Sequence, residues 1–213
     1  MFTNTARRLI LLACTWLPLL HAKPVQAQAQ DLPVAGFYIN GFAGTAIIDS
    51  TVSFAATAKR PAGRFVDQGG DGLLAGARLG WGTVLATHLY AGAELEGVVP
   101  YNVTSRLMPY GAEYRARLRN EVGAYARIGW TSEGGSLVFV RAGFSMPRQI
   151  FTSTQSPDGR SRADWSAVPA FGVGAEVPIW GPAFARVDVG YSLQHGANRL
   201  ETYRLNAGFT LRF

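Results

Sequence analysis

Two histidines and two neighbouring glutamates are the residues of this chain best suited to acid–base chemistry. Beyond residue 29 the only histidines are His88 and His195, and neither stands in a cluster of metal ligands, so we expect no metal and no cofactor. Glu94 and Glu96 lie two residues apart, which places both carboxylates on one face of a strand. Nearby arginines would keep both carboxylates ionised, so we expect salt bridges there rather than catalysis.

A short segment near the C-terminus begins at His195 and is followed by Glu201. It resembles the outer-membrane lipid A deacylases, whose catalytic triad combines a His-x-Ser pair with a glutamate. Ala197 stands where that family has its serine, and Ser192 lies on the wrong side and at the wrong spacing. We therefore predict that the chain is not an enzyme, and we keep a lipid A-modifying acyl hydrolase as an alternative.

The elements that carry these residues show polarity that switches at every second residue, which is the period of a β-strand. The clearest such segment covers residues 202–213, and about eight follow one another along the chain. One face of the last segment carries polar residues and a glycine. The other face is apolar and consists of Tyr203, Leu205, Ala207, Phe209, Leu211 and Phe213.

The N-terminus has the order of a secretory signal peptide. Arg7 and Arg8 precede an apolar run over residues 9–20, and small-residue cleavage sites follow at Ala27 and Ala29. A spanning helix needs roughly 20 apolar residues, and this run is shorter. We predict a cleaved signal peptide over residues 1–29 and a single barrel domain over residues 30–213. The only cysteine is Cys14, so the secreted part would contain no disulfide.

The polar faces of the segments carry charges of both signs. A water-soluble barrel also alternates, but it keeps its apolar face inside. An Arg or Lys side chain facing lipid near the bilayer midplane costs roughly 2–4 kcal/mol, so mixed charges interspersed with glycine favour a shielded lumen inside a membrane barrel. The predicted lumen ionic network consists of Arg78, Glu94, Glu96, Arg115, Arg117, Arg119, Glu121, Arg127, Arg141, Glu176, Arg186, Asp188, Arg204 and Arg212.

Connections between the segments alternate between long and short, as in small bacterial outer-membrane barrels. Residues 49–70, 100–113 and 148–163 are long connections, whereas residues 82–87, 131–135 and 180–182 are short. The fold predicted is thus all-β, a transmembrane antiparallel up-and-down β-barrel of eight strands in the cell outer membrane, with both mature termini in the periplasm. Aromatic residues at the two ends of the strands would form interfacial girdles: Trp81, Trp130 and Trp180 at the short turns, and Tyr101, Tyr110, Tyr114 and Trp165 at the long loops.

Three motifs stand out in the alternating segments: Gly-Phe-Tyr-Ile-Asn-Gly at 36–41, Gly-Ala-Arg-Leu-Gly-Trp at 76–81 and Tyr-Arg-Leu-Asn-Ala-Gly-Phe at 203–209. They resemble the small eight-stranded barrels of the OmpA, OmpX and opacity-protein superfamily, including alphaproteobacterial porin-like surface proteins. The apolar face that ends in Phe213 also resembles the signal read by the barrel-assembly machinery. No peptidoglycan-binding domain follows Phe213, so we do not expect the tethering role of full-length OmpA.

The function expected from these features is a structural role in envelope integrity combined with surface interactions through the long loops. Eight strands leave an interior that side chains fill, so charged residues would plug the lumen. A small-solute porin or channel is the alternative. The partners expected are outer-membrane lipid and lipopolysaccharide, the barrel-assembly machinery and an extracellular or host ligand of the loops. Nucleic acid is not expected, because loss of residues 1–29 leaves 17 basic against 14 acidic residues.

Overall fold

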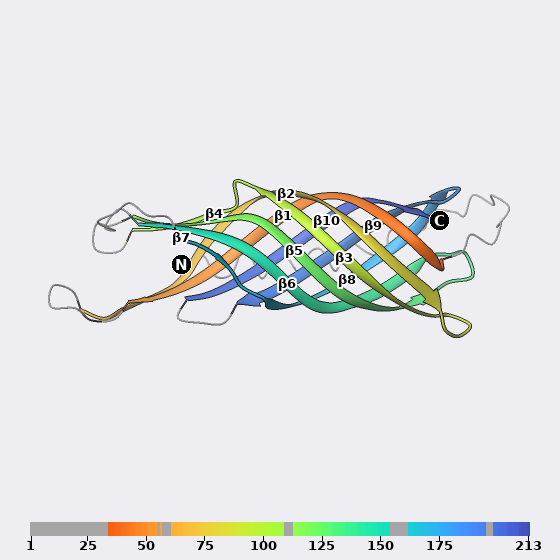
Figure 1. Ribbon diagram of the computed structural model, residues 1–213, viewed down its shortest axis with the longest axis horizontal. Coiled ribbons are helices and arrows are strands. Elements are labelled where there is room, and N and C mark those ends of the chain that lie inside the picture. Colours follow the sequence, from red (N-terminus) through yellow and green to blue (C-terminus); the bar gives the residue numbers. More distant parts are fainter. Residues whose placement is uncertain (1–33, 55, 57–60, 109–112, 154–161, 195–197) are drawn as a thin grey trace. The chain divides into compact units, whose positions relative to one another are not determined.

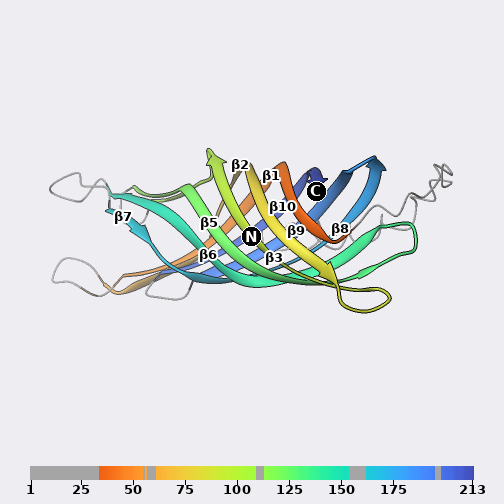
Figure 2. The same ribbon diagram turned by 45° about the vertical axis from the view of Figure 1, so that its right-hand side comes forward.

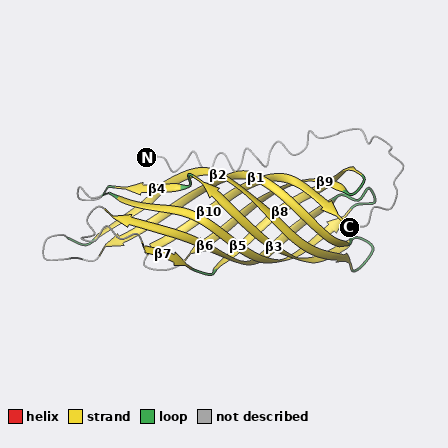
Figure 3. Cartoon of the chain, turned by 45° about the horizontal axis from the view of Figure 1, so that its top comes forward, coloured by secondary structure: helices red, strands yellow, loops and turns green. Residues whose placement is uncertain are grey.

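The computed structural model describes residues 34–54, 56, 61–108, 113–153, 162–194 and 198–213. The predicted signal peptide and His195 lie outside these ranges. The described residues form strands joined by short connections, without a helix long and apolar enough to cross a membrane (Figures 1 and 3). The strands are β1 (Gly36–Phe54), β2 (Gly63–Val84), β3 (Leu89–Tyr101), β4 (Thr104–Leu107), β5 (Tyr114–Thr131), β6 (Leu137–Ser153), β7 (Arg162–Trp165), β8 (Val168–Trp180), β9 (Ala183–Gln194) and β10 (Asn198–Arg212).

The strands form one closed antiparallel barrel, which confirms the predicted fold. β1 pairs with β2 on one side and with β10 on the other, and β5 pairs with both β3 and β6 (Figure 2). β4 and β7 are short additions that pair with β5 and β6 beyond the main wall. The wall itself therefore has eight strands, and every one of them has two hydrogen-bonded neighbours.

Side chains alternate between the lumen and the outside along each strand. Arg78 is 1% exposed, whereas its neighbour Leu79 is 57% exposed. The same contrast separates Arg141, at 2%, from Val140, at 50%. An apolar exterior around a polar interior is the arrangement that a bilayer requires, because hydrocarbon offers no partners for charged groups.

The two ends of the barrel differ in their connections. At one end, here called the short-turn end, residues 85–88, 132–136 and 181–182 join the strands. Gly135 and Gly181 have positive φ values of 76° and 50°, which tight turns of this kind need. At the other end, the hairpin end, β1 and β2 continue well past the apolar stretch. Residues 49–70, which we predicted to be a loop, are therefore largely strand.

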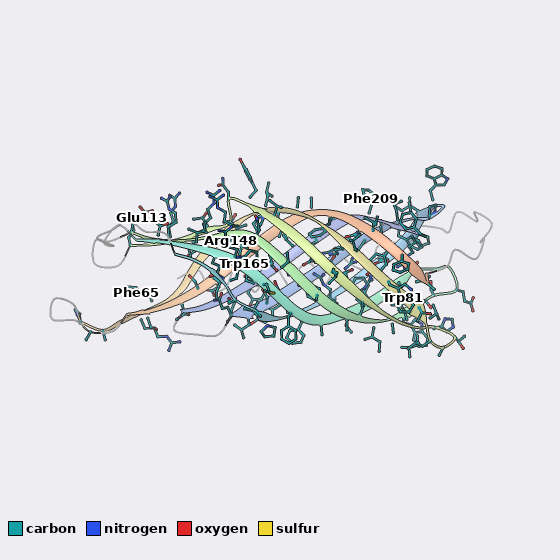
Figure 4. The ribbon with its side chains drawn as sticks, viewed as in Figure 1. Phe65, Trp81, Glu113, Arg148, Trp165 and Phe209 are labelled. Carbon is teal, nitrogen blue, oxygen red and sulfur yellow. The ribbon has the colours of Figure 1, made fainter. Side chains whose placement is uncertain are left out.

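Exposed aromatic side chains mark both ends. Trp130 and Trp180 are 61% and 83% exposed at the short-turn end, and Trp81 lies there too. Tyr101 and Trp165, at 68% and 47%, lie toward the hairpin end, and Figure 4 shows Trp81 and Trp165 far apart along the barrel. Tyr110 and the side chain of Tyr114 lie outside the described residues. The aromatic residues that can be placed therefore fit two interfacial girdles.

Glycines on the lumen face make room for large side chains from the facing strand. A Cβ atom at Gly80 would lie 2.1 Å from Cζ of Tyr38, and one at Gly76 would lie 2.4 Å from Cζ of Phe42. Either contact is far inside van der Waals distance. The alternation of arginine with glycine on the polar faces is thus a packing requirement of the filled interior.

Candidate functional site

The structure brings together eleven of the fourteen charged residues that we predicted to line the lumen. All eleven are at most 4% exposed, and they come from seven different strands. Six are arginines and five are carboxylates, so the cluster carries one excess positive charge. The eleven residues, called the lumen cluster below, are Arg78, Glu94, Glu96, Glu121, Arg127, Arg141, Glu176, Arg186, Asp188, Arg204 and Arg212.

Glu94 on β3 lies at the centre of the lumen cluster. Its Oε2 accepts from Nη1 of Arg186 at 2.5 Å, and its Oε1 accepts from Nη1 of Arg141 at 3.0 Å. The hydroxyl of Tyr38 donates to Oε2 at 2.9 Å. Nη1 of Arg127 lies 3.4 Å from Oε2. One carboxylate therefore ties together side chains from four other elements of the wall.

Glu96, two residues further along β3, forms the second junction. It accepts from Nε of Arg78 at 2.6 Å and from Nη1 of Arg141 at 2.7 Å. Arg78 also donates to both carboxylate oxygens of Asp188, at 3.0 and 3.1 Å. This two-pronged contact fixes the plane of the guanidinium group across the lumen, from β2 to β9.

The two remaining carboxylates hold the ends of the lumen cluster. Glu176 on β8 accepts from Arg127 at 2.7 Å and also from Arg212. Glu121 on β5 pairs with Arg204 at 2.8 Å and accepts from the hydroxyl of Ser145.

Aromatic side chains complete the lumen, and sequence reasoning missed them. The guanidinium of Arg78 stacks 3.8 Å from the ring centroid of Phe42, and that of Arg127 lies 3.9 Å from Phe139. The prediction assigned apolar residues to the lipid face, but Phe42 and Phe139 point into the lumen. Their type does not reveal this; only their position in the alternation of each strand does. Phe42 follows Tyr38 at a spacing of four on β1, and Phe139 precedes Arg141 at a spacing of two on β6, so counting in twos along each strand would have found both rings.

The prediction for Arg115, Arg117 and Arg119 is corrected by a β-bulge. In the pairing of β5 with β6, Leu118 lies opposite Gln149 and Glu121 lies opposite Pro147, so two residues of β5 face one residue of β6. A bulge of this kind shifts the phase of a strand by one residue. Leu118 is buried in the lumen, whereas Arg115 and Arg119 are exposed on the outer surface and Arg117 is half-buried there.

The candidate catalytic residues are not assembled into a site in the described part of the chain. Ser192 is 5% exposed on the lumen side and lies opposite Thr202 in the β9–β10 pairing. Glu201 occupies an outward-facing position on β10 and accepts a hydrogen bond from the Tyr203 hydroxyl at 2.8 Å. The wall thus separates the serine from the glutamate. Among the described residues no group of three His, Cys, Asp or Glu side chains is placed to hold a metal.

The last strand presents its apolar residues outward. Phe209 and Phe213 are 66% and 72% exposed, and Leu205 and Leu211 are 49% and 47% exposed. Ala207 is exposed and Tyr203 is half-buried on the same face. The backbone amide of Phe213 donates to the carbonyl of Phe37 at 2.9 Å, which joins the C-terminus to β1. A role of this strand as an assembly signal stays a prediction.

Apolar clusters lie beyond the lumen cluster along the barrel. One contains Tyr90, Leu137 and Phe139 close to the short turns. The other lies toward the hairpins and contains Phe42, Ala46, Ile48, Leu74, Val98, Val103 and Leu118. Along the described part of the interior, ion pairs and apolar side chains thus follow one another.

Comparison with known proteins identifies the family. Residues 15–213 match the family model described as outer membrane protein beta-barrel domain. No curated protein matches the chain. The structure of Neisserial surface protein A is 13% identical, with a TM-score of 0.51, and the alignment covers 84% of this chain and 98% of that one.

Two further solved structures align with lower scores. Ail, the attachment invasion locus protein of Yersinia pestis, is 11% identical over 83% of this chain and 99% of its own, with a TM-score of 0.44. The N-terminal barrel of Pseudomonas aeruginosa OprF is 13% identical over 81% and 97%, with a TM-score of 0.43. The family match covers nearly the whole chain, and the closed barrel with its apolar exterior agrees with it: the chain belongs to the outer-membrane β-barrel protein family.

Proposed function

We propose that this barrel is a structural component of the outer membrane with a closed lumen, and that it stabilises the envelope and interacts with external partners through its hairpin end. The observation that carries the proposal is the burial of the lumen cluster, in which Arg78, Glu94 and Glu176 are at most 2% exposed. Each of the five carboxylates of the lumen cluster forms an ion pair with at least one buried arginine, and removal of one partner would leave an uncompensated buried charge.

The proposal includes an orientation. Short turns face the periplasm in small bacterial barrels, and long hairpins face outward. The short-turn end would then be periplasmic and would contain Phe213. The hairpins would extend beyond the outer leaflet, where lipopolysaccharide and external ligands are reachable. Delivery to the membrane would depend on the barrel-assembly machinery, which would read the outward apolar face of β10.

A porin is the competing function, and ion conductance separates the two. A porin needs a continuous water path, whereas the lumen cluster joins opposite sides of the wall through Arg78, Asp188 and Glu96. We expect purified, folded protein in planar bilayers to give no stable conductance. The matched variant is Glu94→Ala, which removes the central carboxylate and should allow transient openings. Stable, reproducible channels from the unmodified protein, lost on denaturation, would replace the closed-barrel function with a pore.

A further inference from the structure

The β-bulge on β5 creates an exposed basic surface near the hairpin end of the barrel. It turns Arg119 and Asn120 outward across from Arg148, the single β6 residue that faces the two of them. Arg117 and Arg115 follow on the outer face of β5, and Arg106 on β4 lies opposite Arg115. These five arginines are called the outer basic patch below. Figure 4 shows Arg148, Trp165 and Glu113 in the same part of the molecule, away from Trp81.

The outer basic patch holds more positive charge than its protein neighbours neutralise. Within the described part of the chain, Arg115 alone among the five forms an ion pair, with Glu113 at 2.8 Å. Arg119 faces Arg148 across one strand pair, and Arg106 faces Arg115 across the next. Like charges directly opposite each other on a sheet destabilise it. An anion placed between them would remove that repulsion, and the guanidinium fork suits a phosphate group in particular.

The height of the patch matches the outer boundary of the hydrocarbon layer. The outward residues of β6 are apolar from Val138 through Phe144 and Met146, and Arg148 is the next in phase. The ten residue-to-residue steps from Val138 to Arg148 rise about 25 Å at roughly 3.3 Å per step and a tilt near 40°, which is about the height of the apolar band of such barrels. Trp165 lies opposite Arg148, as an interfacial aromatic would.

Charge on this end of the barrel is also uneven around the wall. On β1 and β10, which lie across the barrel from β6 and β5, the outward phase carries Asp49 and Glu201 after the apolar stretch. A general attraction of arginine to any interface would not produce this division. It instead favours one sector that binds an anionic molecule.

We propose that the outer basic patch binds the phosphate groups of lipid A in lipopolysaccharide. Arg119 and Arg148 lie at the level of the lipid A phosphates. Arg117 and Arg115 lie about 5 and 10 Å further out, at the level of the anionic core sugars. This inference rests on the orientation in the proposed function, in which the hairpin end meets the outer leaflet. It names lipopolysaccharide as a ligand of one sector of the wall rather than as general surroundings.

The test compares lipid A binding by the folded full-length mature barrel and by the variant Arg117→Gln/Arg119→Gln/Arg148→Gln. Each protein is titrated with diphosphoryl lipid A in a neutral detergent, and bound lipid is counted by native mass spectrometry. Arg64→Gln is the matched control, because Arg64 is an exposed β2 arginine outside the patch. We expect at least about tenfold weaker binding by the triple variant, since a single charged hydrogen bond contributes about that factor, and no change for Arg64→Gln.

Further measurements identify the ligand and distinguish loss of binding from loss of folding. Dephosphorylated lipid A should bind the unmodified protein as weakly as diphosphoryl lipid A binds the triple variant. Equal affinity of the triple variant and the unmodified protein for diphosphoryl lipid A would overturn the proposal. So would heparin binding that depends on the three arginines while lipid A binding does not, which would assign the patch to sulfated polysaccharides. Gel mobility before and after boiling checks folding, and the single variants Arg119→Gln and Arg148→Gln, each expected to weaken binding, replace a triple variant that does not fold.

Conductance of the same preparations keeps this test separate from the proposed function. If the bilayers show no conductance and the triple variant binds lipid A as well as the unmodified protein does, the closed-barrel proposal stands and the lipid A site on the outer basic patch is rejected. Open channels together with arginine-dependent lipid A binding would reject the closed barrel and retain the patch.

Discussion

Arg186 and Glu94 are 92 positions apart in the chain, yet Nη1 of Arg186 donates to Oε2 of Glu94 at 2.5 Å across the interior of the barrel. The contact joins β9 to β3, which are not neighbours in the sheet. It therefore connects two parts of the wall that backbone pairing does not join.

Substitution Glu94→Ala should lower the free energy of unfolding by about 3–5 kcal/mol, because it leaves several buried arginines without their shared carboxylate. Urea unfolding of the barrel in detergent micelles or lipid vesicles, followed by tryptophan fluorescence, measures the change. The control is Glu133→Ala in the exposed short turn, which should stay within about 0.5 kcal/mol of the unmodified protein. Equal stability of the two variants would show that the lumen cluster adds nothing to cohesion of the wall.

Gly80→Ala should destabilise the barrel by about 1–3 kcal/mol, because its new methyl group would overlap the ring of Tyr38. Gly41→Ala is the matched control. Gly41 faces outward from β1, and a Cβ atom there meets nothing within 4 Å. The same unfolding measurement applies to both variants, and a Gly80 variant as stable as the Gly41 variant would contradict the tight packing described for the lumen.

Deletion of Phe213 should reduce the amount of folded barrel in cells without changing refolding of the purified chain into detergent. The reason is that an assembly signal acts through a partner, whereas an aromatic residue at the interface acts on stability directly. Folded protein in outer-membrane fractions is measured by its mobility before and after boiling. Phe37→Ala is the control, because Phe37 is 68% exposed at the same end of the barrel. Equal losses in cells for both variants would mean that Phe213 acts as an ordinary interfacial residue.

Single cysteines at the two ends should differ in their accessibility in intact cells. The sequence has Cys14 alone, within the predicted signal peptide, so Arg64→Cys and Glu133→Cys would each carry one thiol after cleavage. We expect a membrane-impermeant maleimide to label the Arg64 variant on β2 and to label the Glu133 variant only after the cells are opened. Labelling of the Glu133 variant in intact cells would invert the proposed orientation.

Period-two alternation predicted the barrel correctly because lipid and lumen impose opposite demands on alternate residues. It worked best on β10, where Phe209 and Thr210 differ fully in polarity. It was least decisive on β1, whose inward residues Phe42 and Ile48 are as apolar as its outward ones. A filled lumen is not uniformly polar, so polarity alone cannot assign its face.

The bulge could not be predicted from one strand. Arg115, Arg117 and Arg119 continue an apparently regular alternation with Ala116 and Leu118. The reversal of their direction depends on two residues of β5 facing Arg148 alone on β6, which is a property of the pair of strands. The extension of β1 and β2 past the membrane was missed for a related reason. Outside the bilayer a hairpin needs backbone pairing but does not need an apolar residue at every second position.

Closure of the barrel between β1 and β10 has a consequence for how the protein is made. Asn40 donates to the hydroxyl of Thr210, 170 positions later in the chain, and the backbone of β1 pairs with β10 along its length. Contacts of such long sequence separation form late in folding. β1 therefore has an unpaired edge until β10 has formed, and such an edge can pair with another chain and aggregate until the barrel closes.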